Sequence, residues 1–348
     1  MSGSTDPIFL LCSERSGSNL ITRIFDNHSR FRAPPTTHIL RILGENLFRY
    51  GDIREPRNWS VLVDDFIALF DAKLGSWSLG SAEVERIARR AVPGSLGELF
   101  LALYRAETDA AGKESFFVKE NQFYNFAPVI LDTCPNARFL YLVRDPRDMA
   151  LSWLTSAALR GGPVRAARVW NTDQQGFVML ASQLAATRRV ACLKYESLID
   201  DPGGALRRVC RDLDVAFEEE MLAFHCKESV IADAAKVADW GNTSKPLMMG
   251  NSGKYRSGLR PDQIAFIEAT CADLMRVFGY HPSLEPPQDL TALTERLTAE
   301  EPFEKAAYQK VAEDERALRE RWQAVVATVR SRIPDSGVAG GSRESLSA

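Results

Sequence analysis

Short apolar runs alternate with longer amphipathic stretches along most of this chain. Four runs are almost entirely apolar, as strands buried on both faces of a sheet should be: Ile8–Ser13, Phe116–Glu120, Phe139–Val143 and Val190–Lys194. Elsewhere the apolar positions recur at helical spacing, which predicts helices over Asn19–Asp26, Tyr124–Thr133, Asp145 to about Arg160, Arg165–Ala186, Gly203–Leu213 and Pro261–Phe278. Strands separated by long helical crossovers predict an α/β fold with a parallel central sheet flanked by helices.

Two other segments have helical patterns but no strand signal. Residues 43–114 are amphipathic, which predicts a helical insertion between the first two strands, suited to form a wall or lid of a substrate site. Residues 290–332 are rich in charge at helical spacings and predict a helix that either packs on the domain or contacts a partner, such as a second copy of the chain. We therefore expect a domain at 1–285, a helical extension at 286–333 and a disordered Gly/Ser-rich tail at 334–348.

Composition narrows the class of protein. The 348 residues are 45% hydrophobic and carry a net charge of -3, so no global basic field predicts nucleic-acid binding. No apolar run is long enough to cross a membrane, and the N-terminus lacks the pattern of a signal peptide. The six cysteines are scattered without metal-like spacing, which indicates reduced thiols of a cytoplasmic protein.

The first predicted strand leads into a compact polar loop, Ser13-Glu14-Arg15-Ser16-Gly17-Ser18-Asn19. One glycine and no lysine exclude the Walker pattern, and three spaced glycines of a dinucleotide fingerprint are absent. Gly17 would allow a ligand to approach the backbone closely, and Arg15 with the polar residues after it could donate hydrogen bonds to an anion at the start of a helix. An ordinary turn with Arg15 in a surface salt bridge is the alternative interpretation.

A second segment makes the anion site the better interpretation. Arg144 stands at the carboxyl end of a predicted buried strand, and Ser152 follows eight residues later, about two turns into the next helix. Asp145 can cap that helix, with Pro146 at its first position. Because ligands of open α/β sheets lie at the carboxyl ends of the strands, the two segments together predict a ligand with two separate phosphate-like groups.

In this order and at this separation, the two segments resemble those of the sulfotransferase family that uses 3′-phosphoadenosine 5′-phosphosulfate (PAPS), and most closely its bacterial branch. Two later segments, Lys194–Leu198 with Asp201-Pro202 and Asn251–Arg256 with Leu259–Pro261, also resemble segments of that family. The similarity covers roughly residues 6–282. It implies a P-loop-like sheet, PAPS as the donor without a metal, and a small-molecule acceptor whose hydroxyl group belongs to a sugar, lipid, phenol or natural product.

The resemblance also implies roles for individual residues in nucleotide binding. The 5′-phosphosulfate would be held by the loop residues Arg15, Ser16, Gly17, Ser18 and Asn19. Arg144 and Ser152 would bind the 3′-phosphate, and Tyr195 would lie near the adenine. Either Lys254 or Arg256 would contact the nucleotide from a closing loop.

The catalytic residues are harder to assign, because the position of the base varies within the family. His38 is our candidate among four histidines, since it follows the helix after the phosphate loop and a neutral imidazole can accept a proton near pH 7. Glu45 is a weaker candidate. Lys119, at the end of a strand, is expected to neutralise charge on the bridging oxygen together with Arg15. Glu14 would repel a nucleotide unless its side chain points outward.

Two other functions stay open from the sequence. A P-loop kinase-like phosphotransferase is the nearest enzymatic alternative, although neither a loop lysine nor Mg²⁺ ligands are evident. A catalytically inactive nucleotide-binding module would bind the bisphosphate product without turnover.

Overall fold

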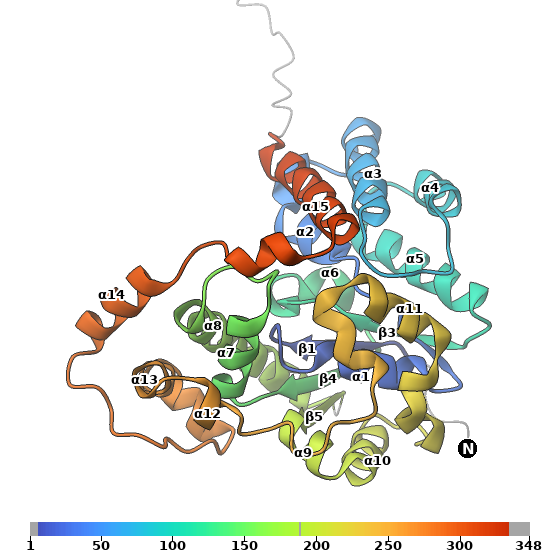
Figure 1. The fold of residues 1–348 in the computed structure, drawn as a ribbon. Coiled ribbons are helices and arrows are strands. Elements are labelled where there is room, and N and C mark those ends of the chain that lie inside the picture. Colours follow the sequence, from blue (N-terminus) through green and yellow to red (C-terminus); the bar gives the residue numbers. More distant parts are fainter. Residues whose placement is uncertain (1–5, 188, 334–348) are drawn as a thin grey trace, which may run out of the picture.

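The computed structural model describes residues 6–187 and 189–333, so the predicted tail at 334–348 lies outside the described residues. Parallel strands form one sheet in the order β2-β3-β1-β4-β5 (Figure 1). The strands are β1 (Ile8–Cys12), β2 (Phe31–Arg32), β3 (Ser115–Lys119), β4 (Arg138–Val143) and β5 (Val190–Lys194). The predicted α/β class and the parallel sheet are confirmed. Strand β2 was not predicted, because two residues are too few to show a periodic pattern.

Alternate side chains of each central strand pack into two different hydrophobic cores, one on each face of the sheet. Phe9 and Leu11 of β1 belong to the core on one face, whereas Ile8, Leu10 and Cys12 belong to the core on the other, and all five are fully buried. The first core contains apolar residues of α2 (Ile39–Glu45), α5 (Leu96–Ala110), α7 (Pro146–Thr155), α8 (Pro163–Ala185) and α13 (Pro261–Val277). The second contains those of α1 (Ser18–Asp26), α9 (Tyr195–Asp200), α10 (Pro202–Asp212) and η3 (Glu219–Cys226). Full burial of one such side chain stabilises the fold by about 1.5–3 kcal/mol, which explains the uninterrupted apolar runs.

Most helix boundaries follow the predicted start signals. The Asp145 carboxylate accepts a hydrogen bond from the backbone N–H of Arg147 at 2.9 Å, and Pro146 occupies the first position of α7. Helix α7 ends at Thr155 rather than near Arg160. The single helix predicted over Tyr124–Thr133 is wrong: η2 (Phe123–Asn125) is followed by a separate α6 (Ala127–Leu131), because Pro128 suits a first turn and not a helix interior.

The segment between β2 and β3 is helical, with η1 (Leu47–Tyr50), α3 (Pro56–Asp71) and α4 (Ser81–Arg90) between α2 and α5. The chain from α10 to α13 adds α11 (Glu228–Lys236), η4 (Ala238–Ser244) and α12 (Tyr255–Gly258). The C-terminal part forms α14 (Leu290–Glu300), η5 (Ala306–Lys310) and α15 (Glu313–Ser331). In Figure 1, α15 lies against α2 and α3, and Arg332 pairs with Asp65 of α3 at 2.8 Å. The extension is therefore packed on the domain.

None of the helices within the described ranges is both long enough and apolar enough to cross a membrane.

Candidate active site

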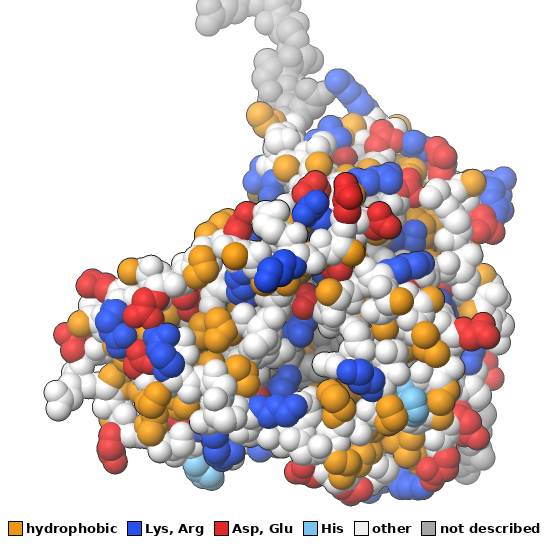
Figure 2. All heavy atoms as spheres, viewed as in Figure 1, with side chains coloured by type: hydrophobic (Ala, Val, Ile, Leu, Met, Phe, Trp, Pro, Cys, Tyr) orange, Lys and Arg blue, Asp and Glu red, His pale blue; other side chains and the backbone are white. Residues whose placement is uncertain are grey.

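A cavity of about 500 Å³ lies at the carboxyl edge of the sheet. Its floor comes from residues that follow strand ends, and its opposite side comes from η4 and the loop after it. Figure 2 shows a hollow near the centre of this face, with Lys and Arg side chains gathered around it. The predicted site residues that line the cavity are Arg15, Gly17, Ser18, Asn19, His38, Lys119, Arg144, Ser152, Tyr195 and Lys254.

The loop after β1 has a backbone that requires glycine at one position. Gly17 has φ +93°, and a Cβ atom there would lie 2.5 Å from the Tyr195 ring. Arg15 also has a positive φ of 63°, a conformation that is rare for residues other than glycine. The Ser16 hydroxyl is buried and has no hydrogen-bond partner within the described residues. The loop thus offers a buried donor at the start of α1.

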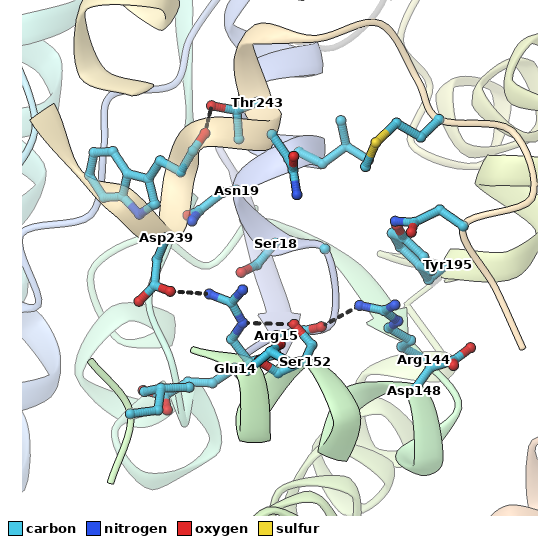
Figure 3. A pocket seen from close by; sticks show the side chains of 18 of the residues that line it. Glu14, Arg15, Ser18, Asn19, Arg144, Asp148, Ser152, Tyr195, Asp239 and Thr243 are labelled. Carbon is cyan, nitrogen blue, oxygen red and sulfur yellow. Dashed lines mark hydrogen bonds and ion pairs between the residues drawn. The ribbon is translucent and has the colours of Figure 1, made fainter. Parts of the chain in front are cut away.

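The two predicted motifs contact each other directly (Figure 3). Arg144 Nη1 donates to the backbone oxygen of Arg15 at 2.9 Å, and Arg15 Nε donates to Ser152 Oγ at 3.0 Å. The Arg144 guanidinium lies over the Tyr195 ring, 4.2 Å from its centroid, and its Nε is buried without a partner in the part of the chain that is described. The structure therefore brings both motifs to the same edge of the sheet, as predicted.

A residue outside every motif completes the surroundings of Arg15. Asp239 of η4 places Oδ1 3.6 Å from Arg15 Nη1 (Figure 3). Its Oδ2 accepts a hydrogen bond from Ser156 Oγ at 3.0 Å. The cationic group of the loop is thus balanced by an internal carboxylate. No local pattern distinguishes Asp239 from any other acidic residue, so only the fold could reveal it.

His38 lies at the start of α2 with a left-handed φ of 57° and lines the cavity. Thr36 Oγ1 lies 3.4 Å from its Nδ1 and donates to Glu120 Oε1 at 3.3 Å. Burial lowers the pKa of His38 well below its ordinary value, and the positive charges of Arg41, Lys119 and Arg319 act in the same direction. The imidazole is therefore neutral near pH 7, as a base must be.

Glu120 adjoins Lys119 but was not predicted as a site residue. It is fully buried, and its Oε2 lies 4.0 Å from His38 Nδ1 and accepts from the backbone N–H of Arg41 at 3.4 Å. Burial raises its pKa to about 7. The alternative base Glu45 does not line the cavity; its Oε1 lies 3.5 Å from Asn125 Nδ2.

Lys119 and Glu14 are each held by an amide side chain. Lys119 Nζ donates to Asn19 Oδ1 at 2.6 Å, and burial lowers the pKa of the lysine. Glu14 does line the cavity rather than pointing away from it, but its Oε1 accepts from Asn121 Nδ2 at 3.0 Å and lies 3.9 Å from Arg41 Nη1. The repulsion that Glu14 would exert on an anion is thus partly neutralised.

Lys254 and Arg256 of the late basic loop take different positions, although the sequence left open which of them contacts the nucleotide. Lys254 lines the cavity, whereas Arg256 is exposed, does not line it, and stacks over the Tyr255 ring at 4.9 Å. Asp148 anchors this loop by accepting from the backbone N–H of Tyr255 at 2.9 Å.

The predicted wall from the helical insertion is largely wrong. Of residues 43–114, Leu74 lines the cavity. The side facing the phosphate loop is built instead by η4 and the residues after it, including Asp239 and Trp240, and by Arg319 of α15. These segments carry no motif, so their place at the site could not be predicted from the sequence.

Comparison with known proteins agrees with this geometry. Residues 7–219 match the sequence profile of the sulfotransferase family, and the chain belongs to that family. The sulfotransferase class predicted from the motifs is thereby confirmed.

Individual relatives are distant. The chain is 21% identical over 291 residues to protein-tyrosine sulfotransferase A of Caenorhabditis elegans, covering 80% of this chain and 68% of that protein. Among solved structures, the sulfotransferase domain of the Synechococcus PCC 7002 olefin synthase has a TM-score of 0.56 and 20% identity, covering 81% of this chain and 97% of that domain. Mouse sulfotransferase SULT7A1 complexed with PAP has a TM-score of 0.42 and 12% identity, covering 79% of this chain and 86% of that one.

Proposed function

We propose that this chain moves a sulfuryl group from PAPS to the hydroxyl group of a small-molecule acceptor. The observation that carries the proposal is the convergence of Arg15, Arg144 and Ser152 at one edge of the sheet. Two separate anionic groups need two sets of donors, and the two motifs supply one set each.

The residues around the cavity fit such a nucleotide. Arg144 lines the cavity, and its Nε has no partner in the described ranges, so it is free to donate to a phosphate oxygen. Ser16 Oγ is also buried without a partner there, but Ser16 does not line the cavity and would have to be reached through the loop. Ser152 Oγ accepts from Arg15, which leaves its own O–H to donate. Gly17 keeps the loop free of a side chain where the Tyr195 ring packs against it.

We assign the 5′-phosphosulfate to Arg15, Ser16, Gly17, Ser18 and Asn19. We assign the 3′-phosphate to Arg144 and Ser152, and the neighbourhood of the adenine to Tyr195. Lys254, rather than Arg256, is the contact from the late loop, because Lys254 lines the cavity.

PAPS supplies the activated sulfuryl group, and the side chains of the chain handle the proton and the charge. His38 accepts the proton of the acceptor hydroxyl; its Nδ1 faces Thr36, so Nε2 is the available nitrogen. Lys119 and Arg15 neutralise the negative charge that grows on the bridging oxygen as the bond to sulfur breaks. Neither role needs a metal.

We also propose that the protein works in the cytoplasm. All six cysteines are free thiols in the structure, in keeping with a reducing compartment.

Calorimetry and a turnover assay test the function together. We expect PAP, the product nucleotide, to bind in the presence of EDTA, and adenosine 5′-phosphate, which lacks the 3′-phosphate, to bind much more weakly. Equal binding of both nucleotides would contradict the two-site assignment. Mass spectrometry of a metabolite extract incubated with labelled PAPS should show a labelled product; PAP binding without any transfer would favour the inactive binding module.

A further inference from the structure

A second cavity, of about 690 Å³, shares residues with the catalytic cavity. It lies between the segment that ends and follows α7 and the helix α15, and Glu14 and Leu159 line both cavities. Trp322 of α15 also lines the second cavity, and its ring meets the His38 ring edge-on at 5.8 Å between centroids. The second cavity, which we name the α15 groove, therefore adjoins the catalytic cavity and contacts His38 through the Trp322 ring.

The walls of the α15 groove change in character along its length. The apolar lining residues are Trp153, Leu159, Trp322 and Val326, and the Trp322 ring contacts His38. Arg330 follows Trp322 by eight residues on α15, which places it about 12 Å further along the helix. A ligand that fills this groove would therefore need an apolar body.

Two cations of the groove have no counter-ion among the described residues. Arg165 of α8 and Arg330 of α15 both line it and are exposed, and neither guanidinium has an ion-pair partner within the described residues. Arg160, which also lines the groove, differs because it pairs with Glu304 at 2.9 Å. Two unpaired guanidiniums from different helices favour an anionic group on the ligand.

Glu14 disfavours an anion at the inner end of the groove, although its contacts with Asn121 and Arg41 weaken that effect. Its carboxylate stands where the groove meets the catalytic cavity, so a second carboxylate at this inner end would be repelled. The neutral hydroxyl belongs at the inner end, beside His38, and the anion belongs near Arg165 and Arg330.

We propose that the acceptor is an elongated amphipathic alcohol with a terminal carboxylate, bound along the α15 groove. This proposal rests on the proposed sulfotransferase function. A span of about 12 Å corresponds to roughly ten carbon–carbon bonds of ~1.5 Å in a zigzag chain. The acceptor class is thus a medium-chain hydroxy acid rather than a sugar or a short alcohol.

Matched acceptors test this class. With PAPS as donor, we expect kcat/KM for 10-hydroxydecanoate to exceed that for its neutral methyl ester by about three- to tenfold, the range of two exposed charge contacts. The shorter 4-hydroxybutyrate should be the poorest of the three. The double variant Arg165→Gln/Arg330→Gln should bring the ratio of acid to ester towards one.

The control variants are Arg168→Gln and Arg321→Gln, which change exposed arginines on the same two helices that do not line the groove. They should keep the wild-type ratio of acid to ester. A ratio near one in the wild type, an unchanged ratio in the double variant, or a stronger preference for an acidic tyrosine peptide that needs the same two arginines would overturn the proposal.

A binding measurement separates this proposal from the function on which it rests. Decanoate has no hydroxyl and cannot be sulfated, but it should alter the tryptophan fluorescence, and do so more weakly in the double variant. Decanoate binding without PAP binding would support the ligand groove and contradict the sulfotransferase mechanism. PAP binding without any effect of decanoate at millimolar concentration would contradict the ligand groove and leave the sulfotransferase mechanism supported.

Discussion

The donor half of the cleft and the acceptor half are built in different ways. Most of the donor half comes from residues that directly follow β1, β4 and β5, which meet because the ends of parallel strands share one edge. Ser152 of α7 and Lys254 of the late loop complete it. The acceptor half combines the first residues of α2 with Trp322 and Arg319 of α15, nearly 300 positions further along the chain. One half is dictated by local chain geometry and the other by how remote helices pack.

The polar groups of the two halves also differ. In the donor half, Ser16 Oγ and Arg144 Nε are left without partners in the described ranges. In the acceptor half, His38 belongs to a chain of contacts through Thr36 to the buried Glu120. The donor half is therefore prepared to bind an anion, and the acceptor half is prepared to position a base. Substitutions in the first should change nucleotide affinity, and substitutions in the second should change turnover.

Replacement of the base should have the largest effect. We expect His38→Ala to lower kcat by about 10²–10⁴, because the hydroxyl proton loses its acceptor. PAP affinity, measured by calorimetry, should stay close to that of the wild type. His281→Ala, which removes an exposed imidazole outside the cavity, is the matched control.

Either of two results would reassign His38. Near-normal turnover would mean that Glu120, or no side chain at all, accepts the proton of the acceptor hydroxyl. A loss of PAP binding would mean that His38 supports the phosphate loop, and the proposed division between the two halves would fail.

Truncation of the 3′-phosphate contact should have the next largest effect. Arg144→Ala removes a charge-assisted contact of about 1.5–3 kcal/mol, which corresponds to roughly ten- to 150-fold weaker PAP binding. Adenosine 5′-phosphate should lose far less affinity, because it has no 3′-phosphate. Arg256→Ala should bind PAP like the wild type, since Arg256 does not line the cavity. Equal losses for both nucleotides would point to a collapsed loop instead.

The same contrast explains what the sequence could predict. The runs that became β1, β3, β4 and β5 are nearly all apolar, and the polar residues after them necessarily meet at one edge. Asp239 and Arg319 lie in segments without a motif, and their positions depend on tertiary packing alone. Glu120 is an intermediate case: Lys119 beside it was predicted, but its approach to His38 depends on how α2 packs against the end of β3.

The pH dependence of turnover should reveal the environment of His38. Because the folded protein holds the pKa of this imidazole well below 6.5, the base stays neutral as the pH falls through 6.5. Glu120, whose pKa is about 7, becomes neutral over the same range and removes a negative charge that would otherwise favour imidazolium. We therefore expect kcat/KM to stay level as the pH falls through 6.5 and to decline only in more acidic solution.

Profiles of wild type and Glu120→Gln between about pH 5 and 8 check this expectation. The variant should keep the acidic limb below pH 6.5, because it has no carboxylate to stabilise the imidazolium. An acidic limb centred at or above 6.5 in the wild type would show an ordinary, solvated histidine. Circular dichroism at each pH separates a loss of catalysis from unfolding.

The smallest predicted effect concerns Asp239, an acidic residue that contacts Arg15 of the donor half. Asp239 lies 3.6 Å from Arg15 and competes with an incoming anion for the guanidinium. Asp239→Asn keeps the shape and removes the charge, so we expect PAP to bind more tightly by up to about fivefold, within the usual worth of a partly exposed ion pair. Added salt should reduce this gain in affinity, because screening weakens the Asp239–Arg15 contact that the wild type makes.

The control is Asp273→Asn on α13, whose carboxylate is exposed and pairs with Arg276. This variant should not change PAP affinity. Weaker binding in Asp239→Asn would mean that the carboxylate holds Arg15 in the orientation that the nucleotide needs.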